Sequence, residues 1–169
     1  MKNVICLMAV VLLMVAGQGF GVIEYKDGGT HNISSTINDD VWVESLAPGM
    51  QTTVNLIAGG VILSSLVLFN DSRLNISGGS VNSELQAAER SQITMSGGWV
   101  GGLRADGGQI TMSGGWVYYL YGSGQIIISG GSIGSDAWLG GEISITGGSV
   151  YGDLVVMGNL TMSGGTVQR

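Results

Sequence analysis

An apolar–polar–apolar triplet recurs along the C-terminal two-thirds of the chain, each time just before a Gly-Gly pair. The triplets are Leu74-Asn75-Ile76, Ile93-Thr94-Met95, Ile110-Thr111-Met112, Ile126-Ile127-Ile128, Ile143-Ser144-Ile145 and Leu160-Thr161-Met162. Successive side chains of a β-strand point to opposite faces, so the outer two residues of each triplet share one face. The pattern predicts a series of short strands, each with one buried face.

The Gly-Gly pairs also set a period. They begin at residues 59, 78, 97, 114, 130, 147 and 164, at intervals of 19, 19, 17, 16, 17 and 17 residues. Further aliphatic residues follow at similar spacing: Ile62, Val81, Val100, Val117, Ile133, Val150 and Val167, then Leu66, Leu85, Leu103, Leu120, Leu139 and Leu154. Glycine fits corners that need a positive φ or a close backbone approach.

A turn of about 17 residues with three apolar sites is too small to bury its own inward face. Stacking solves this, because strands of successive coils pair about 4.8 Å apart and their aliphatic side chains form inner columns. We therefore predict an all-β fold, a single-stranded parallel β-solenoid (β-helix) with about 17 residues per coil. The right-handed form is favoured because its coils tolerate unequal loops. The expected inward residues include Ile93, Met95, Ile110, Met112, Ile143 and Ile145.

An antiparallel sandwich or barrel is the rival architecture, since it also uses short, evenly spaced strands. It would not require the same corner residues in the same register seven times. The segment Gln92–Val100, QITMSGGWV, returns unchanged 17 residues later as Gln109–Val117. This exact repeat favours the solenoid.

Three segments are expected along the chain. Residues 1–21 have the build of a signal peptide: Lys2 is followed by an uncharged apolar run and a small-residue exit, with cleavage after Gly21 or alternatively Gly17 or Gly19. Residues 22–52 do not follow the repeat and are expected to form an N-terminal cap, while residues 53–169 hold the solenoid repeats. No other segment is long enough to span a membrane as a helix.

Composition limits the partners. The chain has 169 residues, with 31 glycines, one proline, six basic and twelve acidic residues, and a net charge of −6. So few cations argue against a nucleic-acid partner. The only cysteine, Cys6, lies in the predicted signal peptide, so we expect no disulfide in the mature chain.

The SGGS and SGGW coils resemble the Gly-Gly-punctuated repeats of autotransporter passengers and related bacterial surface β-helix proteins. The segment VIEYKDGGTHNISSTINDDVWV after the signal peptide is similar to small exported solenoids of bacteria that use PEP-CTERM sorting. The resemblance implies a secreted or cell-surface protein. The sequence lacks the C-terminal anchor and translocator of those proteins and stops at Arg169 in mid-coil, so we expect the repeats to be truncated or the last coil to be open.

No catalytic, metal or cofactor-binding set emerges from the residues. Enzymes built on parallel β-helices need clustered carboxylates with a cation nearby. The only adjacent acidic pair, Asp39-Asp40, lies in the expected cap, and the single histidine, His31, has no cysteine or second histidine to form a metal site. The acidic residues of the repeats, which are not expected to line up, are Asp71, Glu84, Asp106, Asp136, Glu142 and Asp153.

The aromatic residues are the candidate binding site. Trp99 and Trp116 hold the same position in consecutive coils and should stack on the outside, with Tyr118 on the same side of the strand as Trp116. Exposed aromatic rows can bind sugar rings or a protein partner, and stacked rings can also simply stabilise the ladder.

Three functions remain open from the sequence. The first is a non-catalytic, structural or adhesive solenoid of the cell surface or extracellular matrix, with extracellular polysaccharide or another surface protein as partner. The second is a carbohydrate-binding module that uses the stacked tryptophans. The third is the N-terminal fragment of a polysaccharide-active β-helix enzyme.

Overall fold

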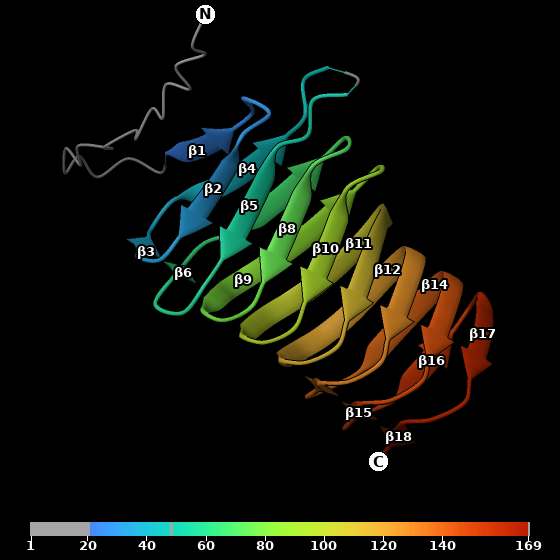
Figure 1. Ribbon diagram of the computed structural model, residues 1–169. Helices are drawn as coiled ribbons and strands as arrows, with labels where there is room; N and C mark the ends of the chain where they lie inside the picture. Colours follow the sequence, from blue (N-terminus) through green and yellow to red (C-terminus); the bar gives the residue numbers. More distant parts are fainter. Residues whose placement is uncertain (1–20, 48, 169) are drawn as a thin grey trace, which may run out of the picture.

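The computed structural model describes residues 21–47 and 49–168, and these form a single parallel β-solenoid (Figure 1). The predicted signal peptide, apart from Gly21, lies outside the described residues. Every strand pairing is parallel, and the strands fall into three columns that run along the solenoid, here called columns A, B and C. In Figure 1 the strands of column A, such as β8 (Arg73–Ile76) and β10 (Gln92–Met95), run down at the front. The chain returns behind them while it advances toward the red end, so the coil is right-handed.

Column A contains the apolar–polar–apolar triplets. Its strands are β2 (Thr30–Ile33), β5 (Thr53–Leu56), β8 (Arg73–Ile76), β10 (Gln92–Met95), the ends of β11 (Trp99–Met112), β12 (Trp116–Ile128) and β14 (Ala137–Ile145), and β17 (Asn159–Met162). Ile93 pairs with Ile110 and Met95 with Met112, so the predicted parallel register is confirmed.

Column B is short and follows the Gly-Gly corners. It consists of β3 (Thr36–Ile37), β6 (Val61–Ile62), the starts of β9 (Ser80–Ala88), β11 and β12, then β13 (Ser132–Ile133), β15 (Ser149–Val150) and β18 (Thr166–Val167). Column C consists of β1 (Val22–Tyr25), β4 (Asp40–Glu44), β7 (Leu66–Phe69), the later part of β9, the middle of β11 and β12, the start of β14, and β16 (Leu154–Val156).

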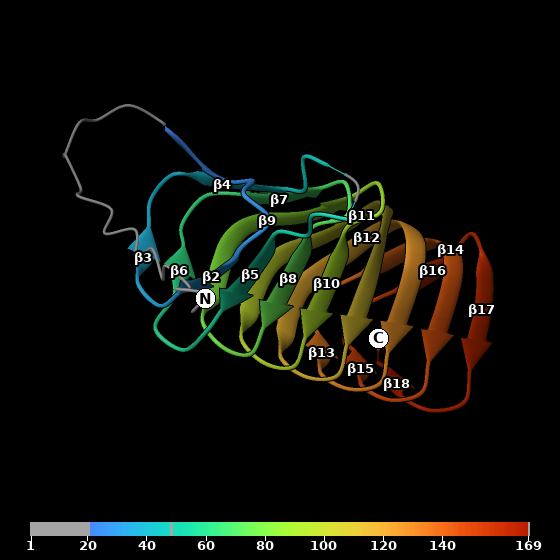
Figure 2. The same cartoon turned by 45° about the horizontal axis from the view of Figure 1, so that its top comes forward.

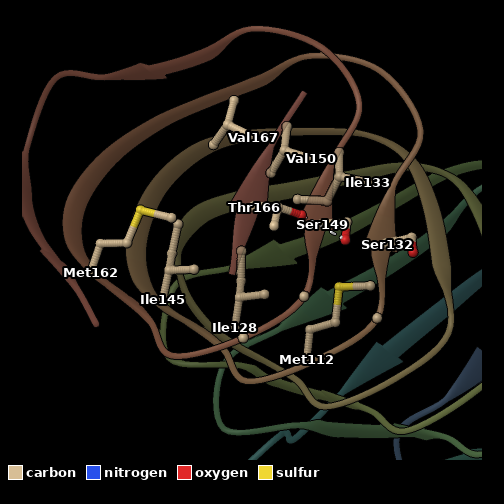
Figure 3. A pocket seen from close by; sticks show the side chains of 13 residues that line it. Met112, Ile128, Ser132, Ile133, Ile145, Ser149, Val150, Met162, Thr166 and Val167 are labelled. Carbon is tan, nitrogen blue, oxygen red and sulfur yellow. Dashed lines mark hydrogen bonds between the residues drawn. The ribbon is translucent and has the colours of Figure 1, made fainter. Parts of the chain in front are cut away.

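The core is the inner surface of these columns. All six side chains predicted to point inward, from Ile93 to Ile145, are at most 3% exposed. Burying each such side chain contributes roughly 1.5–3 kcal/mol, and only the stack as a whole supplies that burial. Figure 3 looks into the C-terminal end, where Met112, Ile128, Ile145 and Met162 come from successive coils. The cavity that these residues line measures about 10 Å³, roughly the space of one water molecule, so the side chains are closely packed there.

The Gly-Gly corners use both properties of glycine. In the pair at 114–115, the second glycine has a φ of +84°, which side-chain-bearing residues rarely adopt. The first glycine is required because the backbone of the preceding coil approaches it closely. A Cβ on Gly114 would lie 2.3 Å from the carbonyl oxygen of Ser96 in that coil. The pairs at 97, 130, 147 and 164 repeat this arrangement.

The segment predicted as a cap, residues 22–52, is itself part of the coil. β1 pairs in parallel with β4, β2 with β5, and β3 with β6, so the parallel coil of the backbone already begins before residue 53. The segment differs in length, because Thr30 and Thr53 of adjacent rungs are 23 residues apart. The extra residues lie in the connection between β4 and β5, which loops out from the stack (Figures 1 and 2).

Candidate functional site: an aromatic groove on column C

Trp99 and Trp116 occupy neighbouring rungs, as predicted, and are 38% and 39% exposed. Their rings do not stack on each other, however. The ring of Trp116 lies over Gly134 of the next coil, where a Cβ would come within 2.4 Å of it. It then stacks on Tyr151, one coil further on, with the ring centroids 5.8 Å apart and the planes 22° apart. The predicted indole pair is therefore replaced by a Trp–Tyr pair that spans three coils.

Tyr118, the third predicted residue, is exposed and begins a short chain of rings. It meets Tyr119 edge-on at 6.0 Å between centroids, and Tyr119 stacks on Tyr121 at 5.4 Å with an interplanar angle of 26°. The ring of Tyr119 lies over Gly102 of the preceding coil, since a Cβ there would be 2.3 Å from it. Tyr119 thus leans toward the N-terminal end of the solenoid.

Tyr121 leans the same way and is held by polar contacts. Its hydroxyl donates a hydrogen bond to Oε1 of Glu84, two coils earlier, at 2.8 Å. Arg104 lies between them: its guanidinium carbon is 5.6 Å from the Tyr121 ring centroid and its Nη1 is 4.0 Å from Glu84 Oε1. Nε of Arg104 is 2.6 Å from Oδ2 of Asp106, which also accepts a hydrogen bond from the Gln86 amide. We call these five residues the Tyr121 network.

Electrostatics reinforce the network. The Asp106 carboxylate is the main cause of a raised pKa of the Arg104 guanidinium, so this cation stays fully charged and engaged. Burial raises the pKa of the Tyr121 hydroxyl, and Glu84 raises it further, so the hydroxyl remains a donor at neutral pH. The charged groups here hold an aromatic ring in place.

An open groove of about 420 Å³ lies beside the leaning tyrosines. Its lining residues are Tyr119, Leu120, Tyr121, Ser135, Asp136 and Trp138. The tyrosines and the tryptophan come from adjacent coils, with Tyr121 and Trp138 directly in register. Trp138 is 51% exposed. Because Tyr119 and Tyr121 lean over the preceding coils, they leave this space on their C-terminal side, and we call it the aromatic groove.

Asp136 is the charged residue of the groove. Its Oδ1 accepts a hydrogen bond from the backbone N–H of Asp153 at 2.9 Å, which fixes its orientation. Within residues 21–47 and 49–168 it forms no ion pair. Asp136 therefore places a carboxyl group beside three aromatic rings without a neighbouring cation among the described residues.

The sequence pattern placed these residues only in part. Glu84 and Asp106, which were expected to stay apart, meet through Arg104. Tyr119, Tyr121 and Trp138 were not predicted as site residues, although Tyr121 and Trp138 are 17 residues apart, one coil length. The remaining acids are dispersed: Asp71 pairs with Arg90, and Glu142 accepts a hydrogen bond from Asn159. In the part of the chain that the structure describes, no three His, Cys, Asp or Glu side chains gather into a metal site.

The geometry defines a parallel β-solenoid with an aromatic groove on one outer face. No protein-family model, curated protein or solved structure matches the chain. Among the described residues, no helix has the length and apolar character needed to cross a membrane.

Proposed function

We propose that the protein is an exported, non-catalytic adhesive solenoid that binds polysaccharide through its aromatic face. This face comprises Trp99, Trp116, Tyr118, Tyr119, Tyr121, Trp138 and Tyr151. The observation that carries the proposal is the aromatic groove, where three rings converge around a space of about 420 Å³ with a hydroxyl and a carboxylate beside them. Small-molecule sites typically measure about 300–1,000 Å³ and combine apolar walls with a few polar groups.

A sugar ring matches this combination. A pyranose presents C–H groups on its faces, which pack against aromatic rings, and hydroxyls around its edge, which need hydrogen-bond partners. Tyr119, Tyr121 and Trp138 supply the rings, while Ser135 and Asp136 supply the partners. An open groove on a regular outer surface also suits a chain that continues beyond the bound unit.

The contacts of the ionisable groups support a binding role over a catalytic one. Glu84 and Asp106 are engaged with Tyr121, Gln86 and Arg104, and one oxygen of Asp136 is engaged with a backbone N–H. Weak contacts repeated along a polymer gain strength through multivalency, so we expect modest affinity for short oligosaccharides and firm retention on insoluble polysaccharide.

The test is retention on a panel of insoluble polysaccharides. Tyr119→Ala/Trp138→Ala should lose binding, whereas Trp42→Ala should not. Trp42 is a matched control, because it is 41% exposed and points outward in the same row of column C, several coils away. Each variant is first checked for an unchanged circular dichroism spectrum.

A second double variant, Trp99→Ala/Trp116→Ala, separates the two parts of the aromatic face. If only this variant loses binding, the site lies on column B and the groove is not used. Binding that survives in both folded double variants would refute the proposal, as would the absence of binding by the wild type. In the last case the ring contacts, such as Trp116 on Tyr151, would serve stability alone.

A further inference from the structure

The charges around the aromatic groove indicate which polysaccharides it accepts. Residues 105–168 contain four acids, Asp106, Asp136, Glu142 and Asp153, and no lysine, arginine or histidine. The nearest cation before them, Arg104, is engaged with Asp106 and Glu84. Across residues 105–168, which form and follow the groove, the chain therefore carries negative charge and no cation.

On the basis of the proposed function, we infer that the groove is selective for uncharged pyranose chains and that Asp136 determines this selectivity. A carboxylate only accepts hydrogen bonds, so Asp136 suits the hydroxyls of a neutral sugar, which donate. A uronic acid carries a carboxylate, which has no hydrogen-bond donor to offer Asp136 and repels it, most strongly at low ionic strength. The negatively charged sulfate group of a sulfated sugar should repel Asp136 in the same way.

The geometry adds a reason for assigning this role to Asp136. The side chain is oriented by the N–H of Asp153, which leaves its second oxygen available to a ligand. The other acids near the tyrosines are committed to the Tyr121 network, on the side of the rings that faces away from the groove. Asp136 is thus the one charged side chain that lines the groove itself.

Affinity electrophoresis or calorimetry at low ionic strength tests the inference with two sets of probes. The neutral set is cello-, laminari-, xylo- and manno-oligosaccharides, and the charged set is oligogalacturonate and oligoalginate. Wild-type protein should bind at least one neutral oligomer and bind the uronates at least about tenfold more weakly. Asp136→Asn keeps an oxygen that can accept the Asp153 N–H, so the fold should be retained. In this variant the ratio of affinities for neutral and uronate oligomers should be several times smaller than in the wild type.

Salt provides an independent readout. At about 1 M salt the Debye length falls to about 3 Å, so the ratio of the wild type's affinities for neutral and uronate oligomers should shrink. The same ratio for Asp136→Asn should change less. Equal binding of neutral and uronate oligomers, or an unchanged ratio in Asp136→Asn, would overturn the selectivity while leaving saccharide binding in place. Failure of the wild type to bind any probe, including the insoluble panel, would overturn the proposed function and this inference together.

Discussion

The same sequence motif has two different environments in this solenoid. In the central coils, Gln109–Val117 reads QITMSGGWV, and in the last coil, Asn159–Val167 reads NLTMSGGTV. Met112 is 1% exposed in the first case, whereas Met162 is 43% exposed in the second. The backbone is alike, since both segments pair in register with the coil before them. The difference lies in coverage: within the described residues a further coil covers Met112, through the pairing of Met112 with Ile128, and none covers Met162.

The comparison shows that the burial of an inward side chain depends on the neighbouring coils as well as on its own coil. A coil's own residues decide which side chains point inward, but neighbours on both sides are needed to cover them. Four predictions are given below from the largest expected effect to the smallest; the first two test this difference directly, and the other two probe a corner and the opposite end of the stack.

The largest effect is expected for a charge in the inner column. Val117→Asp places a carboxylate, without water or partner, between Val100 and Ile133 and should cost on the order of 4 kcal/mol or prevent folding. Val167→Asp, at the same repeat position in the last coil, should cost less than about 1 kcal/mol because the side chain stays in contact with solvent. Thermal denaturation measures both.

Thr111→Asp is the control for the outward face and should also be mild, because Thr111 points away from the core. If Val117→Asp and Thr111→Asp lowered the melting temperature equally, the assignment of inside and outside would be wrong.

The second effect isolates packing without charge. Met112→Ala should destabilise the fold by roughly 2–5 kcal/mol, since it removes a fully buried side chain and leaves a cavity. Met162→Ala removes the same atoms from an exposed position and should cost under about 1 kcal/mol. Urea denaturation gives both values, and a difference of less than about 1 kcal/mol between them would contradict the comparison.

The third effect concerns the glycine corners, where the preceding coil alone decides the outcome. Gly114→Ala would push a Cβ to 2.3 Å from the Ser96 carbonyl oxygen, and we expect a loss of about 1–3 kcal/mol. Gly140→Ala is the control, because its Cβ would make only ordinary van der Waals contacts, the nearest with Ser123 Cβ at 3.4 Å, and its φ is not positive. Equal melting temperatures for the two variants would refute this account of the corners.

The smallest effect lies at the other end of the solenoid. The hydrogen bond between His31 and Asp27, followed by that from the Gly29 N–H, lowers the pKa of Asp27. A lowered pKa means that these contacts stabilise the folded state above the unfolded-state pKa and are lost as the pH falls through the folded-state value. The Asp27 side chain is 62% exposed, so solvent screens the contact and its contribution should stay below about 1 kcal/mol.

Carboxyl NMR titration measures this directly. The Asp27 midpoint should rise in His31→Ala, and an unchanged midpoint would show that the hydrogen bond is not formed in solution.

The fold was largely predictable because the same pattern of apolar, polar and glycine positions recurs in each coil. Alternation identified inward residues such as Ile110 and Met112, and the unchanged nine-residue segment set the register. The parallel pairing of the first coils was not predicted, because their spacing is longer and no Gly-Gly pair precedes residue 59 except Gly28-Gly29. Hydrogen-bonded ladders fix the width of a rung but let a connection such as that between β4 and β5 lengthen freely.

The candidate site was less predictable, because it depends on the directions in which side chains lean. Sequence spacing placed Trp99 beside Trp116 correctly. It could not show that Gly134 lets Trp116 reach Tyr151, or that Gly102 lets Tyr119 tilt and open the groove. These directions follow from small residues in neighbouring coils, which a search for aromatic rows alone does not weigh.

The parallel pairing of adjacent coils also has a consequence for how the chain folds. Paired residues are separated by 16 positions, as for Trp116 and Ser132, up to 25, as for Val41 and Leu66. Folding rates fall as contacting residues lie further apart in sequence, because distant loops cost more entropy to close. No strand in the described stack waits for a partner from the opposite end of the chain. Each finished coil offers an edge on which the next can form, so the solenoid can grow in the order in which its residues are synthesised.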